Sequence, residues 1–227
     1  SDIQVDSTFH AYAFYNKNNV LMDHFYTPIY NGYKDASGKM RSISGKALSF
    51  SLSGQAEITA CKANGDGWYT ETIVDRMLIN MLLILISKST STQSIFGQGM
   101  TSGSESAMKA YLTGSLDTKG MFFGYNATDK AVKVFGMENY WGCQWRRHAG
   151  MIQKGGKAYY KLTRGTVDGS TATDFNTDGT GYIEHSGALS ADSGWQSTQA
   201  FDANLIIPSG VGASDATHMC DYYYVNT

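Results

Sequence analysis

The sequence predicts an α+β protein with short twisted antiparallel strands, one core helix, a weaker second helix, and long ordered loops. Aromatic residues make up 13% of the 227 residues and glycine occurs 25 times, whereas charged residues make up only 17%. This composition favours short strands and ordered turns over helical bundles. In addition, one long segment repeats apolar residues strongly at helical spacing.

The first strands are expected at Thr8–Tyr15 and Leu21–Tyr30, where aromatic and aliphatic residues occur at the density typical of strands. Polar turn residues bound both segments, at Asn16–Asn19 and Asn31–Gly32. The serine-rich segment Arg41–Ser53 is expected to be a further extended piece.

The core helix is expected to run from near Thr70 to near Lys88, with a threonine cap at its start. Apolar residues repeat there at helical spacing, and further ones such as Leu82 and Ile86 widen the stripe almost around the helix. We therefore expect this helix to lie in the centre of the core. The weaker second helix is expected within Ser104–Leu112.

Further strands are expected in the second half of the chain. Gly120–Gly124 and Lys130–Phe135 resemble strands in composition, and Lys157–Leu162 alternates apolar and polar residues. A short apolar strand, Leu205–Pro208, is stopped by its proline. Between the last two, Gly165–Gly187 consists mainly of Thr, Asp, Gly and Ser, which predicts a long exposed loop or hairpin.

The chain is expected to form a single domain, residues 1–227, because no linker or run of charges divides it. Its 18 basic and 20 acidic residues give a net charge of −2, which is not the basic footprint of a nucleic-acid-binding protein. The longest apolar run, Met77–Ile86, contains Asn80 and is too short to cross a bilayer, and we recognise no signal peptide. We expect neither nucleic-acid binding nor membrane insertion.

The segment Gly136–Met151, called here the tryptophan loop, carries Trp141 and Trp145 four residues apart between glycines. This pattern fits neither strand alternation nor an amphipathic helix. Glycine permits positive φ and close backbone approach, and each tryptophan brings a large apolar body with one N–H that needs a partner. The pattern predicts a packed, irregular loop.

Within this loop the pattern Gly-x-Glu-Asn-x-Trp-Gly-x-x-Trp resembles the central loop of C-type-lectin-like domains of the formylglycine-generating or sulfatase-modifying type, as found in bacteriophage tail and receptor-binding proteins. The resemblance extends over most of the chain, to Phe25–Tyr30, Ala63–Trp68, Ile95–Gly99 and Asp221–Tyr224. It implies a C-type-lectin-like domain, which we expect to lack its C-terminal closing strands. The structural signature residues that it implies are Trp68, Glu138, Asn139, Trp141, Gly142 and Trp145.

The resemblance does not imply an enzyme here. The family's namesake enzymes oxidise a substrate cysteine with a cysteine pair near the C-terminal end of the domain, and Cys143 and Cys220 do not reproduce that pair. Function is argued from sites rather than folds, so we expect no catalytic residue. Cys61, Cys143 and Cys220 are an odd number without CxxC spacing, which favours small buried thiols, with one disulfide as the alternative.

A polar segment near Asp174 is the candidate metal site. Asp174, Asn176 and Asp178 place oxygens at alternate positions around a tight glycine turn, and with the Thr180 carbonyl they are candidate calcium ligands. A calcium loop places glutamate at position twelve, whereas Glu184 stands at eleven. Calcium binding and an ordinary Asx-rich turn both stay open, and no other cofactor is expected.

The basic triplet Arg146-Arg147-His148 has two interpretations. It could contact a ligand directly. Alternatively, the arginines form a scaffold of cation–π contacts and salt bridges beside the tryptophans, which is the more common role of such a cluster.

The resemblance implies a phage virion protein, a tail fibre, spike or tip component that is assembled in the host cytoplasm and displays loops for recognition of a host-surface glycan or protein. The sugar-binding triplets of calcium-dependent lectins are not found, which leaves sugar stacking on exposed aromatic rings. Candidate ligand-binding residues are Tyr182, Trp195, Tyr222, Tyr223 and Tyr224. The alternative is a decoration or assembly protein, as a homotrimer, that binds only other virion proteins, with Tyr222–Tyr224 in the core or at a subunit interface.

Overall fold

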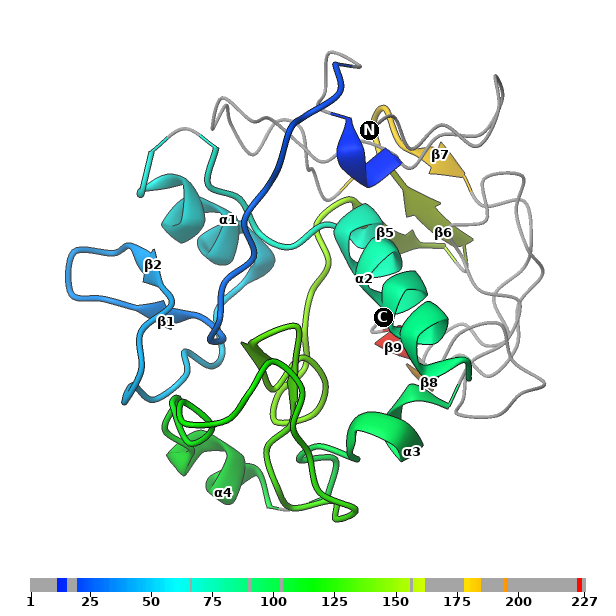
Figure 1. Cartoon of the computed structure of the whole chain (residues 1–227). Coiled ribbons are helices and arrows are strands. Elements are labelled where there is room, and N and C mark those ends of the chain that lie inside the picture. The colour runs from blue at the N-terminus through cyan, green and yellow to red at the C-terminus, as the bar shows by residue number, and fades with distance from the viewer. Residues whose placement is uncertain are drawn as a thin grey trace. The chain divides into compact units, whose positions relative to one another are not determined.

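The computed structural model describes residues 12–15, 20–65, 67–89, 91–102, 104–155, 157–161, 178–184, 194–195 and 224–225 (Figure 1). The helices are η1 (Tyr12–Phe14, a 3-10 turn), α1 (Gly54–Lys62), α2 (Ile73–Ser87), α3 (Thr92–Phe96) and α4 (Glu105–Ala110). The strands are β1 (Tyr33–Lys34), β2 (Met40–Arg41), β3 (Lys133–Val134), β4 (Met137–Glu138), β5 (Met151–Lys154), β6 (Lys157–Tyr160), β7 (Ile183–Glu184), β8 (Gly194–Trp195) and β9 (Tyr224–Val225). This mixture of helices and short antiparallel strands confirms the α+β class.

The strands form small antiparallel sheets. β5, β6 and β7 make a three-stranded sheet in that order, while β1 pairs with β2, β3 with β4, and β8 with β9. Strands of two to four residues offer few ladder hydrogen bonds, so their positions depend on packing and on polar contacts from the loops.

The chain folds into two compact units, and each is assembled from segments that are far apart in the sequence. The first unit contains residues 1–25, 69–91 and 148–227. The second contains residues 26–68 and 92–147. That the two units form the single domain expected from the sequence stays a prediction.

In the first unit, α2 begins and ends with well-formed caps. The Thr72 hydroxyl accepts the Asp75 backbone N–H at 3.2 Å, and the Asp75 carboxylate accepts the Thr72 N–H at 3.3 Å, which is a capping box. At the other end Lys88 adopts φ 54° and its N–H donates to the Ile84 carbonyl at 2.8 Å. The helix expected between Thr70 and Lys88 is thus confirmed.

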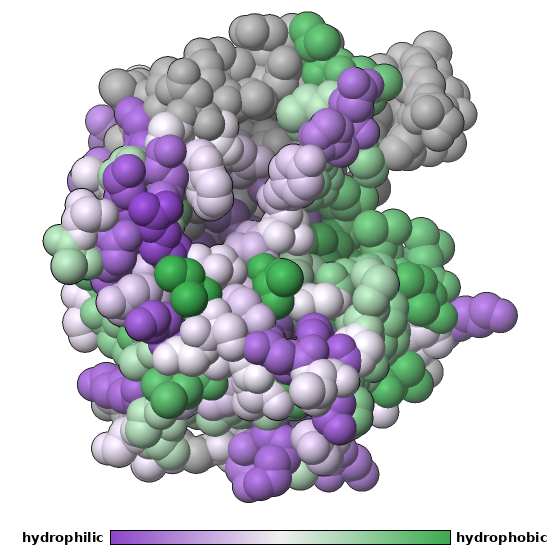
Figure 2. Space-filling view, turned by 60° about the vertical axis from the view of Figure 1, so that its left-hand side comes forward, coloured by the Kyte–Doolittle hydropathy of each residue, from purple (hydrophilic) through white to green (hydrophobic). Residues whose placement is uncertain are grey.

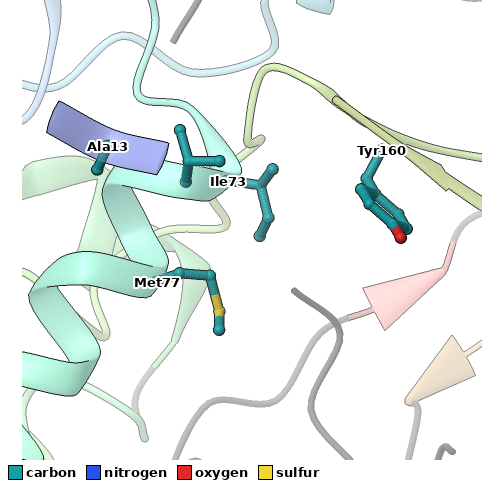
Figure 3. Packing of buried hydrophobic residues seen from close by; sticks show 5 residues of the cluster. Ala13, Ile73, Met77 and Tyr160 are labelled. Atoms are coloured by element: carbon teal, nitrogen blue, oxygen red, sulfur yellow. The ribbon is translucent and has the colours of Figure 1, made fainter. Parts of the chain in front are cut away.

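One face of α2 builds the core of the first unit (Figure 3). Its first turns pack with η1 and with Tyr160 of β6, and Tyr160 is only 1% exposed. The buried cluster consists of Ala13, Ile73, Val74, Met77 and Tyr160. The Ile73 N–H donates to the Ala149 carbonyl at 3.0 Å, and the Ala149 N–H donates to the Glu71 carbonyl at 2.9 Å, which ties the start of the helix to the segment before β5.

Toward its C-terminal end the opposite face of α2 is exposed, so the helix expected in the centre of the core is covered only in part. Leu85 is 73% exposed and Ile86 is 52% exposed, and Met81 and Leu82 on the same part of the helix are also exposed. Figure 2 shows hydrophobic residues gathered in one broad area at the right of that view. A wide apolar stripe allows a helix to be buried on many sides, but the elements that pack against the helix decide how many sides are covered.

The second unit contains α1, α3, α4 and two hairpins. α4 lies within Ser104–Leu112, and the Ser104 hydroxyl accepts the Ala107 N–H at 3.2 Å, so the expected second helix is confirmed. α1 was not expected. Its N-cap is Ser53, whose hydroxyl accepts the Ala56 N–H at 3.2 Å. Only Ala60 of its residues is buried, which leaves little apolar periodicity to reveal the helix.

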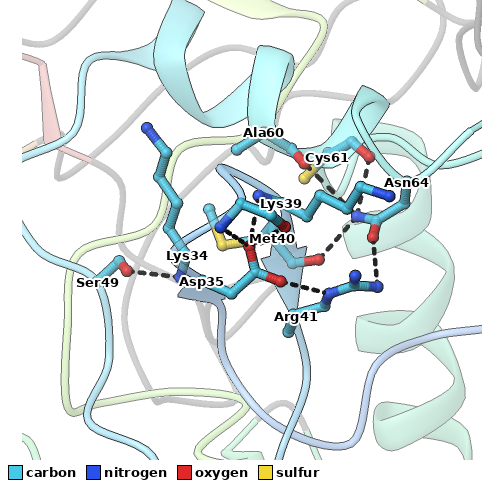
Figure 4. Close-up of polar contacts among 10 residues, drawn as sticks. Lys34, Asp35, Lys39, Met40, Arg41, Ser49, Ala60, Cys61 and Asn64 are labelled. Carbon is cyan, nitrogen blue, oxygen red and sulfur yellow. Dashed lines mark hydrogen bonds and ion pairs between the residues drawn. The ribbon is translucent and has the colours of Figure 1, made fainter.

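The turn between β1 and β2 is organised by one carboxylate (Figure 4). Asp35 accepts the backbone N–H groups of Ser37 at 2.9 Å and Lys39 at 3.0 Å, and it accepts the Arg41 Nε–H at 2.9 Å. Hydrogen bonds from Ser37 first, then from Arg41, hold the pKa of Asp35 well below its usual range. Arg41 also donates to the Asn64 side chain at 2.8 Å, which connects this hairpin to the end of α1.

The expected opening strands do not form within the described residues 12–15 and 20–30. Tyr12–Phe14 is a 3-10 turn, and the segment Leu21–Tyr30 takes part only in an isolated bridge between Tyr15 and Leu21. The part of Thr8–Tyr15 before residue 12 lies outside the described residues. Apolar density alone does not make a strand, because the backbone groups also need a partner strand.

The other expected extended segments are shorter than predicted. Arg41–Ser53 contributes only Arg41 to a strand, with a bridge at Ala47. In Gly120–Gly124 only Phe123 forms a bridge, with Lys133 of β3.

The strand expected at Lys157–Leu162 is confirmed by β6, which pairs in register from Lys157 to Tyr160. Of the loop Gly165–Gly187, only residues 178–184 are described, and they contain β7. The expected strand Leu205–Pro208 lies outside the described residues. In the described part of the chain, no helix combines the length and apolar character needed to cross a membrane.

Candidate functional site

The tryptophan loop begins at the two-residue turn that joins β3 and β4. Phe135 and Gly136 occupy this turn, with φ of 48° and 79°. Positive φ at both positions suits the twist of a two-residue hairpin, but it is strained for a bulky side chain. The Phe135 ring packs edge-on against Phe122, with 4.9 Å between ring centroids, and this contact offsets part of the strain.

Behind this turn the Glu138 side chain is the centre of a buried polar network. Glu138 is 3% exposed. One carboxylate oxygen accepts the Tyr111 hydroxyl at 2.5 Å and the Gly114 N–H at 2.9 Å, and the other accepts the Leu116 N–H at 3.0 Å. Burial first, then the hydrogen bond to Glu138, raises the pKa of Tyr111. The carboxylate thus anchors the segment after α4 to β4.

Lys133, the neighbour of Glu138 across the β3–β4 pair, anchors the same segment from another side. It is 8% exposed, and its ammonium group donates to the carbonyls of Leu116 at 3.0 Å and Lys119 at 3.3 Å. Glu138 therefore satisfies backbone donors and Lys133 satisfies backbone acceptors. Buried charges persist in this way when hydrogen bonds replace their lost hydration.

Trp141 is packed, as the sequence predicts. It is 6% exposed, and its indole N–H donates to the Gly97 carbonyl at 3.0 Å. Next to it, Gly142 adopts φ 76° and lies so close to Met100 that a Cβ there would be 2.7 Å from the Met100 nitrogen. The Cys143 N–H then donates to the Met100 carbonyl at 2.9 Å. Glycine at 142 is therefore required by both conformation and space.

The two cysteines that the structure describes, Cys61 and Cys143, are not in a disulfide. Cys143 is buried and burial raises the pKa of its thiol to about 11, while Cys61 is half-buried. This agrees with the interpretation of small buried thiols for Cys143. Cys220 lies outside the described residues.

The two arginines after Trp145 form a scaffold, which favours the second interpretation of the basic triplet. The Arg146 guanidinium donates to the Asn31 side chain at 2.5 Å and to the Asn139 carbonyl, and it lies 5.7 Å from the centre of the Tyr140 ring. Arg147 donates to the Glu57 carboxylate at 2.6 Å and to the Leu52 carbonyl, just before α1, at 2.7 Å. Both arginines and these partners belong to the second unit.

His148, the last member of the triplet, belongs to the first unit. Its Nδ1 lies 3.6 Å from the Glu71 carboxylate, where it forms an ion pair when protonated.

The implied signature residues divide into anchors and exposed residues. Glu138, Asn139 and Trp141 are buried, and Gly142 is required by its positive φ. By contrast, Trp145 is 70% exposed and Trp68 is 54% exposed, so the packed position expected for Trp145 is wrong. Arg146 and Arg147 bind Asn31 and Glu57 beside it, and most of the Trp145 ring lies on the surface.

The candidate calcium segment is described only from Asp178 onward. Asp178 accepts the Thr180 N–H at 2.8 Å, and this backbone hydrogen bond lowers the pKa of its carboxyl group. Such a contact is an Asx turn, the alternative interpretation for this residue. Glu184 is bound to Lys157 and to the Tyr159 hydroxyl at 3.1 Å.

Among the residues that the structure describes, no group of three or more acidic, histidine or cysteine side chains is arranged to hold a metal. Asp174 and Asn176 lie outside the described residues, so calcium binding stays a prediction.

Three of the candidate ligand-binding aromatics, Tyr182, Trp195 and Tyr224, are described, and they belong to the first unit. The Lys161 ammonium lies 5.1 Å from the centre of the Tyr182 ring, a cation–π contact. Trp195 and Tyr224 are backbone partners in the β8–β9 pair. Tyr222 and Tyr223 lie outside the described residues, and a ligand role for any of these residues stays a prediction.

The structure also gathers aromatic side chains that no sequence pattern indicated. Phe96 stacks on Phe122 with 5.2 Å between centroids, and Phe122 meets Phe135. Ile95 and Met121, which precede Phe96 and Phe122 in the sequence, are exposed. The three phenylalanines come from α3, an irregular segment and a hairpin turn, so no single period connects them.

Comparison of the chain with protein-family models, with curated proteins and with solved structures finds no match.

Proposed function

We propose that the protein is a non-enzymatic component of a bacteriophage tail, a fibre, spike or tip protein of the virion, whose C-type-lectin-like fold presents loops to the surface of the host cell. The resemblance of the tryptophan loop and its companion motifs supports this class. Trp145 is the observation that carries it furthest, because a tryptophan that is 70% exposed stands on a loop that is anchored on both sides.

The anchors make the loop suitable for recognition. On one side Glu138 and Trp141 tie it to the segment after α4 and to Gly97, and on the other Arg146 and Arg147 tie it to Asn31 and Glu57. A loop held in this way loses little conformational entropy when it binds.

Tryptophan is also among the residue types that contribute most to binding energy at interfaces, and its ring can stack on a sugar. We therefore assign Trp145 as a contact residue for a host-surface glycan or protein, beside the loop residues expected from the sequence.

The second candidate function is a virion decoration or assembly protein that binds only other virion subunits. The exposed apolar face of α2 favours it, because Leu85 and Ile86 expose apolar surface that a partner would cover.

Binding of the fluorescently labelled full chain to a panel of bacterial cells tests the proposal. We expect saturable binding to at least one species, and Trp145→Ala should weaken it by about tenfold or more. Trp68→Ala, which also removes an exposed tryptophan from the second unit, is the matched control and should change binding little.

Treatment of the cells and the buffer separates the modes of recognition. Loss of binding after periodate oxidation of the cells assigns a glycan receptor, and loss after protease treatment assigns a protein receptor. Sensitivity to EDTA would support calcium at Asp174–Thr180. Binding to none of the species, or equal binding by Trp145→Ala, contradicts host recognition through this loop and favours the assembly role.

A further inference from the structure

We propose that Asn31 is a modification site, at which the side-chain amide is converted to an acid by spontaneous deamidation in the folded protein, assisted by Arg146. Asn31 stands directly before Gly32. Deamidation is favoured at asparagine followed by glycine, because glycine has no side chain to hinder the approach of its backbone nitrogen. The proposal concerns the chain itself and does not depend on host recognition by the tryptophan loop.

The reaction needs only the chain and water. The Gly32 backbone nitrogen forms a bond to the side-chain carbonyl carbon of Asn31, and the bond from that carbon to Nδ2 breaks. Nδ2 leaves as ammonia with the proton of the attacking nitrogen, and a cyclic imide remains. Water then opens the imide. Hydrolysis of the new bond restores the normal backbone and gives aspartate, whereas hydrolysis of the other carbonyl bond of the nitrogen gives isoaspartate.

The contacts of Asn31 suit each part of this reaction. Arg146 donates to Asn31 Oδ1 at 2.5 Å, and because a guanidinium only donates, this contact identifies the amide oxygen. Negative charge develops on that oxygen when the nitrogen adds to the carbonyl carbon, and a guanidinium N–H directed at it stabilises the charge. Among the residues that the structure describes, neither the departing Nδ2 nor the attacking Gly32 N–H has a hydrogen-bond partner. No such bond has to break before the reaction.

The chain contains a second Asn-Gly pair, Asn64-Gly65, whose contacts are the opposite. Both asparagines are half-buried, so exposure does not distinguish them. The Asn64 Nδ2 donates to the Met40 carbonyl at 2.8 Å and to the Cys61 carbonyl at 3.1 Å (Figure 4). The Gly65 N–H donates to the Lys62 carbonyl at 2.9 Å. Both the leaving group and the attacking nitrogen are held here, so we expect this pair to be protected.

The folded structure also accommodates the aspartate product at position 31. The Asn31 Nδ2 is a buried donor without an acceptor among the described residues, and its replacement by oxygen removes this unsatisfied group. The new carboxylate lies against the Arg146 guanidinium, where a hydrogen bond between two charged groups is stronger than the one it replaces. Arg146 also donates to the Asn139 carbonyl and lies over the Tyr140 ring. The added charge therefore acts on the scaffold of the tryptophan loop.

Peptide mapping by mass spectrometry, on the full chain stored at mildly alkaline pH, tests the proposal. In the folded chain the acid should accumulate at Asn31 about tenfold faster or more than at Asn64, because each hydrogen bond that must first be given up slows the reaction. In the chain unfolded by concentrated guanidinium chloride the two pairs should react at similar rates, since these contacts are lost. Asn31→Asp provides the reference peptide for the aspartate product.

Two variants, both checked for folding by circular dichroism, test the part assigned to Arg146. Arg146→Gln removes the charge beside Asn31 Oδ1 and should slow the reaction at Asn31 by about tenfold. A purely structural effect has the opposite sign, because a loosened loop would let the Gly32 nitrogen approach more easily. Arg147→Gln is the matched control: Arg147 binds Glu57 rather than Asn31, so the rate at Asn31 should stay that of the wild type.

Equal rates at the two pairs in the folded chain, or a faster reaction at Asn64, overturn the proposal. So does a folded chain in which neither pair reacts under conditions where the unfolded chain reacts at both. An unchanged or raised rate at Asn31 in Arg146→Gln overturns the assistance by Arg146.

Discussion

Replacement of Glu138 is expected to loosen the segment after α4, because this carboxylate is the common acceptor for three donors that lie 22 to 27 residues away. In Glu138→Gln the amide oxygen can take the place of the oxygen that accepts Tyr111 and Gly114. The amide NH2 group then faces the Leu116 N–H, so two donors oppose each other and the Leu116 N–H loses its acceptor.

The expected destabilisation follows from these contacts. A buried N–H without an acceptor costs about 1–3 kcal/mol, and the exchange of a charged acceptor for a neutral one weakens each remaining hydrogen bond by about 1 kcal/mol. Glu138→Gln should therefore lower the free energy of unfolding by about 3–5 kcal/mol. Glu138→Ala removes all three acceptor contacts and should lower it by about 4–6 kcal/mol, with water entering the site as the partial compensation.

Urea unfolding followed by tryptophan fluorescence measures the free energy, and hydrogen exchange measures the Gly114 and Leu116 amides directly. Both amides should exchange faster in Glu138→Gln, with the larger change at Leu116. Glu57→Gln is the matched control: Glu57 has a single ion pair with Arg147, so about 1 kcal/mol or less is expected. A Glu138→Gln variant within about 0.5 kcal/mol of the wild type, with unchanged exchange at both amides, would refute the reasoning.

Two other predictions concern conformation and pH. Gly142→Ala should lower the free energy of unfolding by about 2–4 kcal/mol in the same urea assay, because φ is 76° and the new Cβ would be 2.7 Å from the Met100 nitrogen. Gly38→Ala is the control: its φ is similar but the space around it is open, so it should lower the free energy of unfolding by only about 1–2 kcal/mol. Equal losses in the two variants would contradict a clash at position 142. The folded-state pKa of Asp35 is lowered, so its contribution to stability is present above the unfolded pKa of about 3.9 and is lost as pH falls below it. The thermal midpoint of Asp35→Asn should therefore lie below that of the wild type at neutral pH and approach it below about pH 4, and a constant difference across this range would exclude the contribution.

Local patterns in the sequence determined the elements whose signals are local. The α+β class, the span of α2 with its threonine cap, α4 and β6 all follow from composition, helical spacing and alternation. Trp141 was likewise expected to be packed, since a tryptophan between glycines needs both space and an acceptor for its N–H. These features depend on residues that are near one another in the chain, so their physics is visible in the sequence.

Only the tertiary structure decided which side of each element is covered. Trp141 and Trp145 are the same residue type in the same loop, yet one is buried against Gly97 and the other is 70% exposed. Likewise, the apolar pattern of α2 does not show that Leu85 and Ile86 are exposed. The sequence around Glu138 does not show that its hydrogen-bond donors come from residues 111–116. Burial and hydrogen-bond partners depend on contacts between segments that are distant in the chain, and the spacing of residues within one segment does not show which other segment will contact it.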